Sequence, residues 1–533
     1  MIAGAVSLPI LSVIVNIFVP SGDIWTHLVD TVLIDYITNS FILMLGVGAL
    51  TILFGVSTAW VITMVEFPGR AVFEWLLLLP LAIPAYLMAY IYTDFFDVTG
   101  ILQVFIRDYF SISVNEYWFP NIRSRGGAII IMALAFYPYV YLLARASFLE
   151  QSVSFLEAGR SLGYSTRETF FKVSLPLARP GIIAGTALVL METLNDFGTV
   201  QYFGIQTFTT GIYRTWFGLG ERVAAAQLSA FLLGFIFLLI ILERKSRVKK
   251  NIEQEGTSRF KRIRRFSPSR IQKVLSIILC SLPVVLGFIF PLVLLLIMFI
   301  QNIDVAINAR FYGYIINTIS IALLTAFVAV LIALIMAYAK RLSPTPQIRL
   351  LNRIAAIGYA IPGSVIAVGV LIPFGLVDNA LDSWLRDQFN ISFGLIFSGT
   401  LFAMVFAYLV RFLAVSFNAV EASLEKITPN MDEAATGMGY SFLKILRKIH
   451  IPMMSSSLFT ALLLVIVDVM KELPATLIVR PFNFDTLAIQ VYRLASDERL
   501  AESSGAALAI ILVGLIPVLL LNRSISKSRK TEE

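Results

Sequence analysis

Residues 157–176 read EAGRSLGYSTRETFFKVSLP, and residues 433–452 read EAATGMGYSFLKILRKIHIP. The two stretches align without a gap at an offset of 433 − 157 = 276 residues, and both lie between long apolar runs. The residues that both copies share include Glu157/Glu433, Ala158/Ala434, Gly163/Gly439, Tyr164/Tyr440, Ser165/Ser441 and Pro176/Pro452. A polar segment that recurs at one register in an apolar chain predicts that a second protein binds two symmetric sites.

The composition around these segments is that of a membrane protein. Of the 533 residues, 58% are hydrophobic and 14% are charged, and the mean hydropathy is +0.83. Soluble domains average about 45–50% apolar and about 25% charged residues. Apolar runs of about 20 residues, long enough to cross ~30 Å of hydrocarbon, recur about twelve times. We therefore predict an all-α polytopic membrane protein. The expected spans lie near residues 2–20, 39–66, 72–93, 127–147, 180–203, 223–243, 272–300, 316–339, 354–376, 393–415, 456–478 and 503–522.

The basic residues gather in polar connections and set the topology. Residues 243–270 hold eleven Lys and Arg against three Glu, so the positive-inside rule places this linker in the cytoplasm, beside anionic lipid headgroups. Both repeated stretches then fall on the cytoplasmic side, and the net charge of +8 gives no indication of a nucleic-acid partner. The first apolar run has neither a basic segment before it nor a cleavage site after it, so we interpret it as a span rather than a signal peptide.

The repeat extends beyond the two polar stretches. Residues 82–89, AIPAYLMA, match residues 360–367, AIPGSVIA, at an offset of 278. The same offset relates Tyr36, Asn39 and Ser40 to Tyr314, Asn317 and Thr318. The predicted organisation is a first six-span repeat over 1–243, a basic cytoplasmic linker over 244–271, a second six-span repeat over 272–523 and a cytoplasmic tail over 524–533. Because six is even, both copies face the same way and a pseudo-twofold axis runs along the membrane normal.

Each polar stretch is predicted to form two short helices separated by a turn at Gly. Gly163 permits the positive φ of such a turn. Ser165 followed by Glu168 predicts a capping box at the start of the second helix, which Pro176 is expected to end. The second copy has Lys444 in place of the acid, so its cap should be weaker.

These stretches resemble the E-A-A-x-x-x-G motif with a downstream L-P that marks the permease subunits of binding-protein-dependent ABC importers. The matching residues are Glu157, Ala158, Gly159, Gly163, Leu175 and Pro176, and then Glu433, Ala434, Ala435, Gly439, Ile451 and Pro452. Gly159 and Ile451 depart from the motif. The resemblance implies that each stretch couples to a cytoplasmic ATPase, present in two copies, that an extracytoplasmic protein delivers the substrate, and that the chain lies in the bacterial cytoplasmic (inner) membrane. The chain has no G-x-x-x-x-G-K-[ST] phosphate loop, so ATP is expected in the partner. We expect no enzymatic activity or cofactor in the chain itself.

Acidic residues follow each stretch inside an apolar run. Glu192 and Asp196 stand four residues apart, as do Asp468 and Glu472, and an offset of 276 relates the two pairs. Residues four apart share a helix face, and charges at bilayer depth usually face an aqueous path or a bundle interior. The four carboxylates predict a path for a cation, without a permanently bound metal. The alternative is structural: Lys471 would neutralise Asp468 or Glu472, and Asn195 would bond a neighbouring helix.

The cargo is indicated by resemblance alone. Residues 468–488 and 495–502 resemble the C-terminal half of fused permeases for ferric iron, and hard oxygen ligands suit such a hard cation. Thiamine, phosphonate, sulfate and polyamine importers have related permeases and remain alternatives. An ion-driven secondary transporter would instead show inverted repeats and no docking motif.

Overall fold

The computed structural model describes residues 1–149, 151, 163–248, 265–392 and 394–530. Within these ranges the chain is all-α, apart from one isolated bridge between Val65 and Phe266. The first half contains α1 (Ile2–Val15), α2 (Asp23–Thr31), α3 (Leu33–Met64), α4 (Arg70–Leu76), α5 (Ala85–Phe96), α6 (Ile101–Phe110), α7 (Arg125–Leu149), α9 (Thr166–Thr169), α10 (Leu175–Asn195), α11 (Gly198–Tyr202), α12 (Phe208–Tyr213) and α13 (Arg222–Val248).

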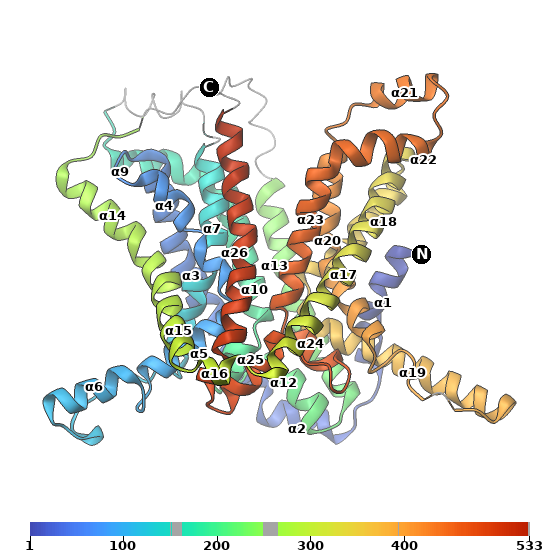
Figure 1. The fold of residues 1–533 in the computed structure, drawn as a ribbon, viewed down its shortest axis with the longest axis horizontal. Coiled ribbons are helices and arrows are strands. Elements are labelled where there is room, and N and C mark those ends of the chain that lie inside the picture. Colours follow the sequence, from blue (N-terminus) through green and yellow to red (C-terminus); the bar gives the residue numbers. More distant parts are fainter. Residues whose placement is uncertain (150, 152–162, 249–264, 393, 531–533) are drawn as a thin grey trace.

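The second half repeats this order of helices. It contains α14 (Arg270–Val284), α15 (Phe290–Gln301), α16 (Ile303–Ala306), α17 (Ala309–Leu342), α18 (Pro346–Ala355), α19 (Gly363–Phe389), α20 (Leu401–Leu424), α21 (Pro429–Gly437), α22 (Phe442–Ile445), α23 (Ile451–Lys471), α24 (Pro474–Val479), α25 (Leu487–Ser496) and α26 (Leu500–Lys530). The long helices run alongside one another in one bundle (Figure 1). The predicted all-α polytopic class is confirmed.

The number of spans agrees with the prediction, but two of them are not straight. Ten helices in the described part of the chain are long and apolar enough to cross a membrane, and two bent pairs bring the total to twelve. The first pair, α1 and α2, bends by 95°, and the second, residues 70–82 with 85–110, bends by 88°. The predicted span at 72–93 is therefore broken, at a turn that ends in Pro84, because proline cannot donate a backbone hydrogen bond.

The first helix of each half packs against the other half. Helix α1 lies beside α19 of the second half, while α14 and α15 lie beside α3 and α5 of the first (Figure 1). Gly369 makes the contact with α1 close, because a Cβ there would stand 2.3 Å from the Pro9 carbonyl oxygen. The predicted linker at 244–271 lies mostly outside the described residues, and the division of the chain there stays a prediction.

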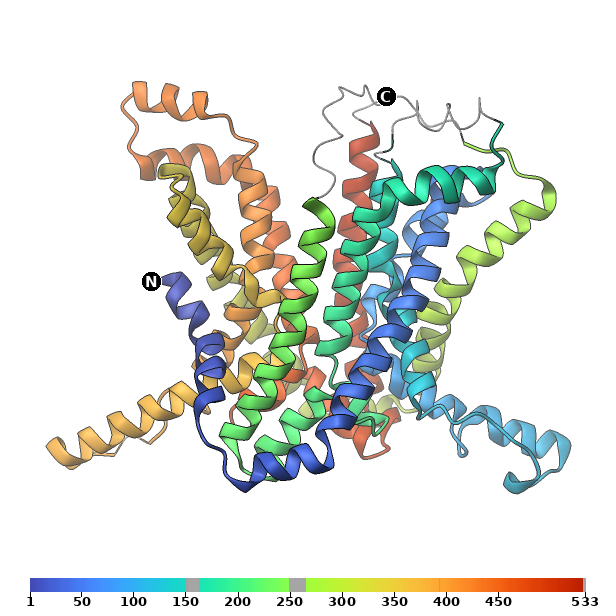
Figure 2. The same ribbon diagram turned by 180° about the vertical axis from the view of Figure 1, so that it is seen from behind.

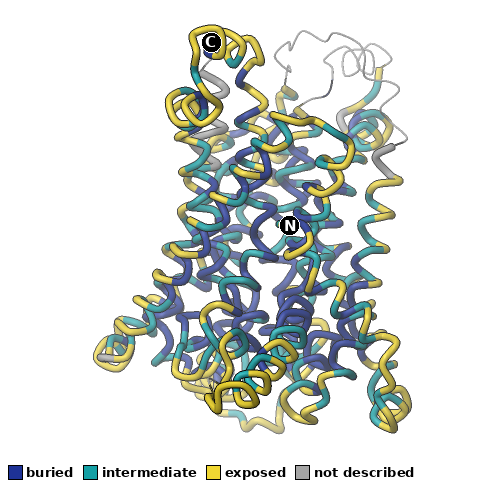
Figure 3. Tube along the Cα trace, turned by 90° about the vertical axis from the view of Figure 1, so that its right-hand side faces the viewer, coloured by how far each residue is buried: buried dark blue, intermediate teal, exposed yellow. Residues whose placement is uncertain are grey.

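Two arms project sideways from one end of the bundle (Figures 1 and 2). One is α6, and the other is the end of α19. Helix α19 continues past the end of the predicted span at 354–376 and remains helical to Phe389. Buried residues fill the middle of the bundle, and exposed ones gather at both ends (Figure 3).

Candidate coupling elbows and central cavity

The two repeated stretches lie at the same end of the bundle. We name residues 163–174 the first elbow and residues 429–450, which include α21 and α22, the second elbow. Both lie at the end that holds the C-terminal part of α26 and the end of α13, on opposite sides of the molecule (Figures 1 and 2). By the positive-inside rule this is the cytoplasmic end. Glu157, Ala158 and Gly159 lie outside the described residues.

The shared Gly-Tyr-Ser sequence forms the turn of each elbow. Gly163 and Gly439 have φ of +80° and +79°, the left-handed conformation that the sequence predicts. In the second elbow the Gly439 amide donates to the Thr436 carbonyl at 2.9 Å, and the Tyr440 amide donates to the Ala435 carbonyl at 3.1 Å. This pair of bonds is a Schellman motif, which satisfies the last carbonyls of α21.

The caps of the two second helices differ, as predicted. The Ser165 amide donates to the Glu168 carboxylate at 3.1 Å, and the Glu168 amide donates to the Ser165 hydroxyl oxygen at 3.3 Å. Ser441 starts α22 without a side-chain cap bond. Each repeated Tyr lies under a lysine: Lys172 Nζ is 4.7 Å from the Tyr164 ring centre, and Lys444 Nζ is 4.2 Å from that of Tyr440.

Pro176 does not end the second helix of the first elbow, contrary to the prediction, and neither does Pro452 in the other copy. Each lies in the first turn of the following span, α10 or α23. A π-helical turn, at 170–174 and at 446–450, joins the short helix to the span. Such a turn accommodates the hydrogen bond that proline cannot donate. The elbows are therefore helical continuations of the spans.

The second elbow exposes apolar side chains next to its acidic motif residue. Glu433 and Ala434 are exposed, whereas Ala435 is buried. The exposed large apolar residues of this elbow are Met431, Met438, Phe442 and Leu443, of which Leu443 is 72% exposed. An apolar patch on a polar, cytoplasmic surface is typical of a protein interaction site.

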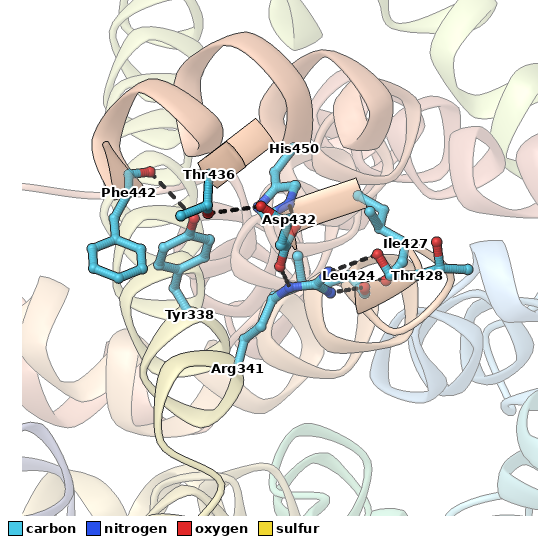
Figure 4. Close-up of polar contacts among 9 residues, drawn as sticks. All are labelled: Tyr338, Arg341, Leu424, Ile427, Thr428, Asp432, Thr436, Phe442 and His450. Carbon is cyan, nitrogen blue, oxygen red and sulfur yellow. Dashed lines mark hydrogen bonds and ion pairs between the residues drawn. The ribbon is translucent and has the colours of Figure 1, made fainter. Parts of the chain in front are cut away.

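Arg341 of α17 joins the second elbow to the spans (Figure 4). Its Nε donates to Asp432 Oδ2 at 2.7 Å, Nη1 donates to the Leu424 carbonyl at 2.8 Å and Nη2 to the Ile427 carbonyl at 3.0 Å. The fully buried His450 places Nε2 2.7 Å from Asp432 Oδ1. Burial would raise the pKa of Asp432, but the hydrogen bonds and charges of Arg341 and His450 outweigh it and lower that pKa below its ordinary value.

Aromatic packing occupies the corresponding place under the first elbow. Trp60 of α3 lies 5.5 Å from Phe148, 5.0 Å from Phe170 and 6.4 Å from Phe266, measured between ring centres. Trp60 corresponds to Tyr338, whose hydroxyl donates to the Phe442 carbonyl at 3.3 Å. We name these two sets of contacts the elbow roots.

A cavity of about 160 Å³ lies between the halves, and all four predicted acids line it. Two of them have a structural task. Asp196 accepts from the Thr199 amide at 3.0 Å and the Val200 amide at 3.2 Å, which caps α11. Glu472 likewise accepts from the first amides of α24, at 3.1 and 3.0 Å.

These caps correct the predicted helix face. Helix α10 ends at Asn195 and α23 ends at Lys471, and Asp196 and Glu472 have extended backbone angles. The acids therefore do not form i, i+4 pairs along one helix. The apolar run continues beyond each break, which is why hydropathy alone predicts an unbroken span there.

Polar side chains at the break tie the halves together. Asn195 accepts from the Gly363 amide at 3.0 Å and from Arg411 Nη1 at 3.2 Å, which agrees with the structural alternative for Asn195. Arg411 also donates to Glu472 Oε1 at 2.8 Å. Lys471 donates to the Leu81 carbonyl of the other half at 3.1 Å and makes no ion pair within the described part of the chain.

The side-chain carboxylates of Glu192 and Asp468 have neither a hydrogen bond nor an ion pair with any described residue, although both residues line the cavity. The sequence prediction missed Arg411, which is the one charged residue in the predicted span at 393–415 and could have been recognised on that ground. It also missed the phenols that line the cavity, which are Tyr86, Tyr139 and Tyr359. Among the residues that the structure describes, no three His, Cys, Asp or Glu are grouped to hold a metal ion.

A duplicated helical bundle with paired cytoplasmic elbows and a polar cavity between its halves defines a membrane permease. The chain belongs to the family described as "Binding-protein-dependent transport system inner membrane component", which matches residues 51–244 and again 329–529. It is therefore a multi-pass inner-membrane permease of a binding-protein-dependent ABC importer, a transport subunit rather than an enzyme. Membership implies a substrate-binding protein and an ATPase as partners.

Relatives with different cargoes cover different shares of the chain. The Fe(3+)-transport system permease protein FbpB 2 of Haemophilus influenzae is 26% identical over 92% of this chain and 90% of its own. The ferric transport system permease protein FbpB of Actinobacillus pleuropneumoniae is 22% identical over 91% of this chain and 70% of its own. The molybdenum transport system permease protein ModB of Escherichia coli K12 is 30% identical, over 32% of this chain and 74% of its own.

Proposed function

We propose that this permease carries ferric iron through the cavity between its halves, and that each elbow docks one of two copies of a cytoplasmic ATPase that binds the ATP. The observation that carries the cargo proposal is the pair Glu192 and Asp468. These residues are related by the repeat and line one cavity, and their carboxylates have no hydrogen-bond or ion-pair partner among the described residues.

The other lining groups favour a cation with oxygen ligands. Four carboxylates face two cationic side chains, and one of those, Arg411, already pairs with Glu472. The Tyr86 hydroxyl is buried and has no hydrogen-bond partner among the described residues. Carboxylate and phenol oxygens are hard ligands, which suit a hard cation. The two relatives named for iron also match more than nine-tenths of the chain.

An oxyanion is the second candidate cargo. Arg411 and Lys471 line the same cavity, and relatives named for molybdenum and sulfate match 32% and 28% of the chain. We favour iron because Arg411 is paired with Glu472 and the cavity holds four carboxylates against two cationic side chains.

Docking of the ATPase is supported by the exposed surface of the second elbow. Glu433 stands beside Met431, Met438, Phe442 and Leu443, all exposed at the cytoplasmic end. A cluster of apolar side chains around a charge is what a partner groove would bury.

The test is transport by the reconstituted importer, with its binding protein and ATPase in proteoliposomes, using radioactive ferric iron. The double variant Glu192→Gln with Asp468→Asn should lose most iron uptake, about tenfold or more, because functional intramembrane charges are costly to replace. The ATPase should still co-purify. The matched control is Asp304→Asn, an exposed acid in α16, which should transport normally.

Uptake by the double variant at the unmodified rate would contradict the proposed path. If the unmodified importer takes up molybdate or sulfate but not iron, the cargo proposal is wrong, while ATPase docking is judged separately from co-purification.

A further inference from the structure

Helix α17 is held by polar contacts at both ends. At the cytoplasmic end Arg341 binds the second elbow through Asp432. At the other end Asn317 donates to the Asp485 carbonyl at 3.1 Å, and the Thr318 hydroxyl accepts from the Leu487 amide at 2.9 Å. A helix of 34 residues is about 51 Å long at 1.5 Å per residue. Helix α17 thus connects the elbow to the segment before α25 at the opposite end of the bundle.

The Arg341 side chain fixes three segments at once. Its guanidinium binds the carboxylate of Asp432 in α21, the carbonyl of Leu424 at the end of α20 and the carbonyl of Ile427 in the turn that follows. The planar guanidinium holds several acceptors in a fixed geometry. His450, which lies in the π-helical turn before α23, contacts the same carboxylate and so connects that turn to it. The side chain of Arg341 is only 15% exposed, so solvent competes little with these contacts.

The first half has different side chains at the corresponding positions. Thr63 stands at the position of Arg341, and Ser174 at that of His450, by the offsets of 278 and 276. Leu156 corresponds to Asp432 and lies outside the described residues. Helix α3 keeps the contact at its outer end, because Asn39 donates to the Gln206 carbonyl at 2.8 Å. Its cytoplasmic end packs through Trp60 against aromatic rings, and its Ile62 carbonyl accepts a hydrogen bond from Arg70, which lies outside the elbow.

We propose that Arg341 is a positioning residue that transmits movement of the second elbow to α17, and that the two ATPase docking sites are therefore mechanically unequal. The inference rests on the proposed docking of an ATPase at the elbows. Directional, charge-assisted bonds hold α21 at a fixed angle to α17, whereas aromatic packing permits rings to slide. Nucleotide-driven movement reaches the outer end of the second half through α17.

The experiment compares coupling with docking in the reconstituted importer. Arg341→Gln and Asp432→Asn are measured singly and together, with Lys340→Gln as the matched control. Lys340 is the neighbouring residue and pairs with Glu421 of α20 and with Glu425 directly after it. The two readouts are the amount of ATPase that co-purifies and the number of ATP molecules hydrolysed per cargo ion.

Each single variant should raise the ATP consumed per cargo ion about three- to tenfold, the range expected for residues that modulate coupling. Both substitutions break the same link between α17 and α21. The double variant should therefore consume no more ATP per cargo ion than either single variant. Co-purification should be unchanged, and Lys340→Gln should behave as the unmodified chain. Arg341→Lys keeps the positive charge but loses the planar guanidinium. It should consume an intermediate number of ATP molecules per cargo ion.

If Arg341→Gln hydrolyses as many ATP molecules per cargo ion as the unmodified chain, the inference is overturned. Loss of ATPase binding in that variant would also overturn it, because Arg341 would then build the docking surface rather than transmit movement. If the unmodified chain itself fails to bind an ATPase, the proposed docking is wrong, which is a different result.

Discussion

At the root of the first elbow Trp60 packs against Phe148 and Phe170, whereas at the root of the second Arg341 and His450 hold the carboxylate of Asp432. The cavity shows the same contrast: Arg411 pairs with Glu472 in the second half, and Ala135 stands at its place in the first. The backbone features, in contrast, occur in both halves, including the left-handed glycines. Duplication has thus preserved the chain path, while the two copies place their buried ionic contacts differently: Glu74 pairs with Arg145 in the first half, and Glu472 pairs with Arg411 in the second.

The largest effect is expected where the halves differ inside the bundle. Arg411→Ala leaves the Glu472 carboxylate, whose side chain is 1% exposed, without its cation. Removing one partner of such a pair costs about 3–5 kcal/mol, and thermal unfolding in detergent should show the loss. Adding Glu472→Gln should recover part of it. An unchanged unfolding temperature in the single variant would mean that the two halves do not differ in this respect.

The elbow glycines test what the halves have in common. In Gly163→Ala and Gly439→Ala the new residue must adopt a positive φ, which costs about 1–2 kcal/mol. No steric clash adds to this cost, because nothing lies within 4 Å of the added Cβ at either site. Hydrogen exchange of the elbow amides should therefore accelerate equally in both variants. Gly437→Ala, inside α21, is the control and should stabilise the helix by about 0.5–1 kcal/mol. A large effect in only one half would contradict the shared backbone.

The serines at the start of the second helix of each elbow, Ser165 and Ser441, should differ in their contribution to helix stability, by a smaller amount. Ser165→Ala removes a capping box and should cost about 1 kcal/mol, whereas Ser441→Ala removes no side-chain cap bond and should be nearly neutral. Hydrogen exchange at residues 166–169 and 442–445 measures both. Equal acceleration would show that Ser441 also caps its helix.

Acid should loosen the contacts that Asp432 makes in the second root. The pKa of Asp432 is lowered in the folded protein, so its contribution to stability is complete above the unfolded pKa of about 3.9. That contribution is lost as the pH falls through the folded value. Limited proteolysis of the second elbow should be constant from about pH 7 to 5 and should increase below about pH 4. Asp432→Asn should abolish this dependence, and a dependence that persists would assign it to another group.

Local patterns in the sequence predict the parts of the site that local chemistry determines. Gly163, Gly439 and the Ser165 box follow from the conformational freedom of glycine and the reach of a serine side chain. The parallel duplication follows from the even number of spans and the fixed offset. The gathering of four acids around one cavity was expected from their matched positions, and the structure shows it.

The remaining features depend on contacts between distant segments. Arg341 and Asp432 are 91 residues apart in the chain, and no local pattern pairs them. The breaks after Asn195 and Lys471 are invisible to hydropathy, because the apolar sequence continues beyond them. Their cause is tertiary: the carboxylates of Asp196 and Glu472 bind the first amides of α11 and α24.

The most direct test of the paired elbows uses a matched pair of cysteines. Arg167 and Leu443 are both exposed and are related by the offset of 276. Each is changed to Cys in a Cys280→Ala background, which removes the single native, buried thiol. A membrane-impermeant maleimide is then applied to inside-out and right-side-out vesicles, with and without bound ATPase. We expect both sites to react only in inside-out vesicles and to be protected when the ATPase is bound. Labelling of either site from the outer face, or equal labelling with and without the ATPase, would contradict a pair of cytoplasmic docking elbows.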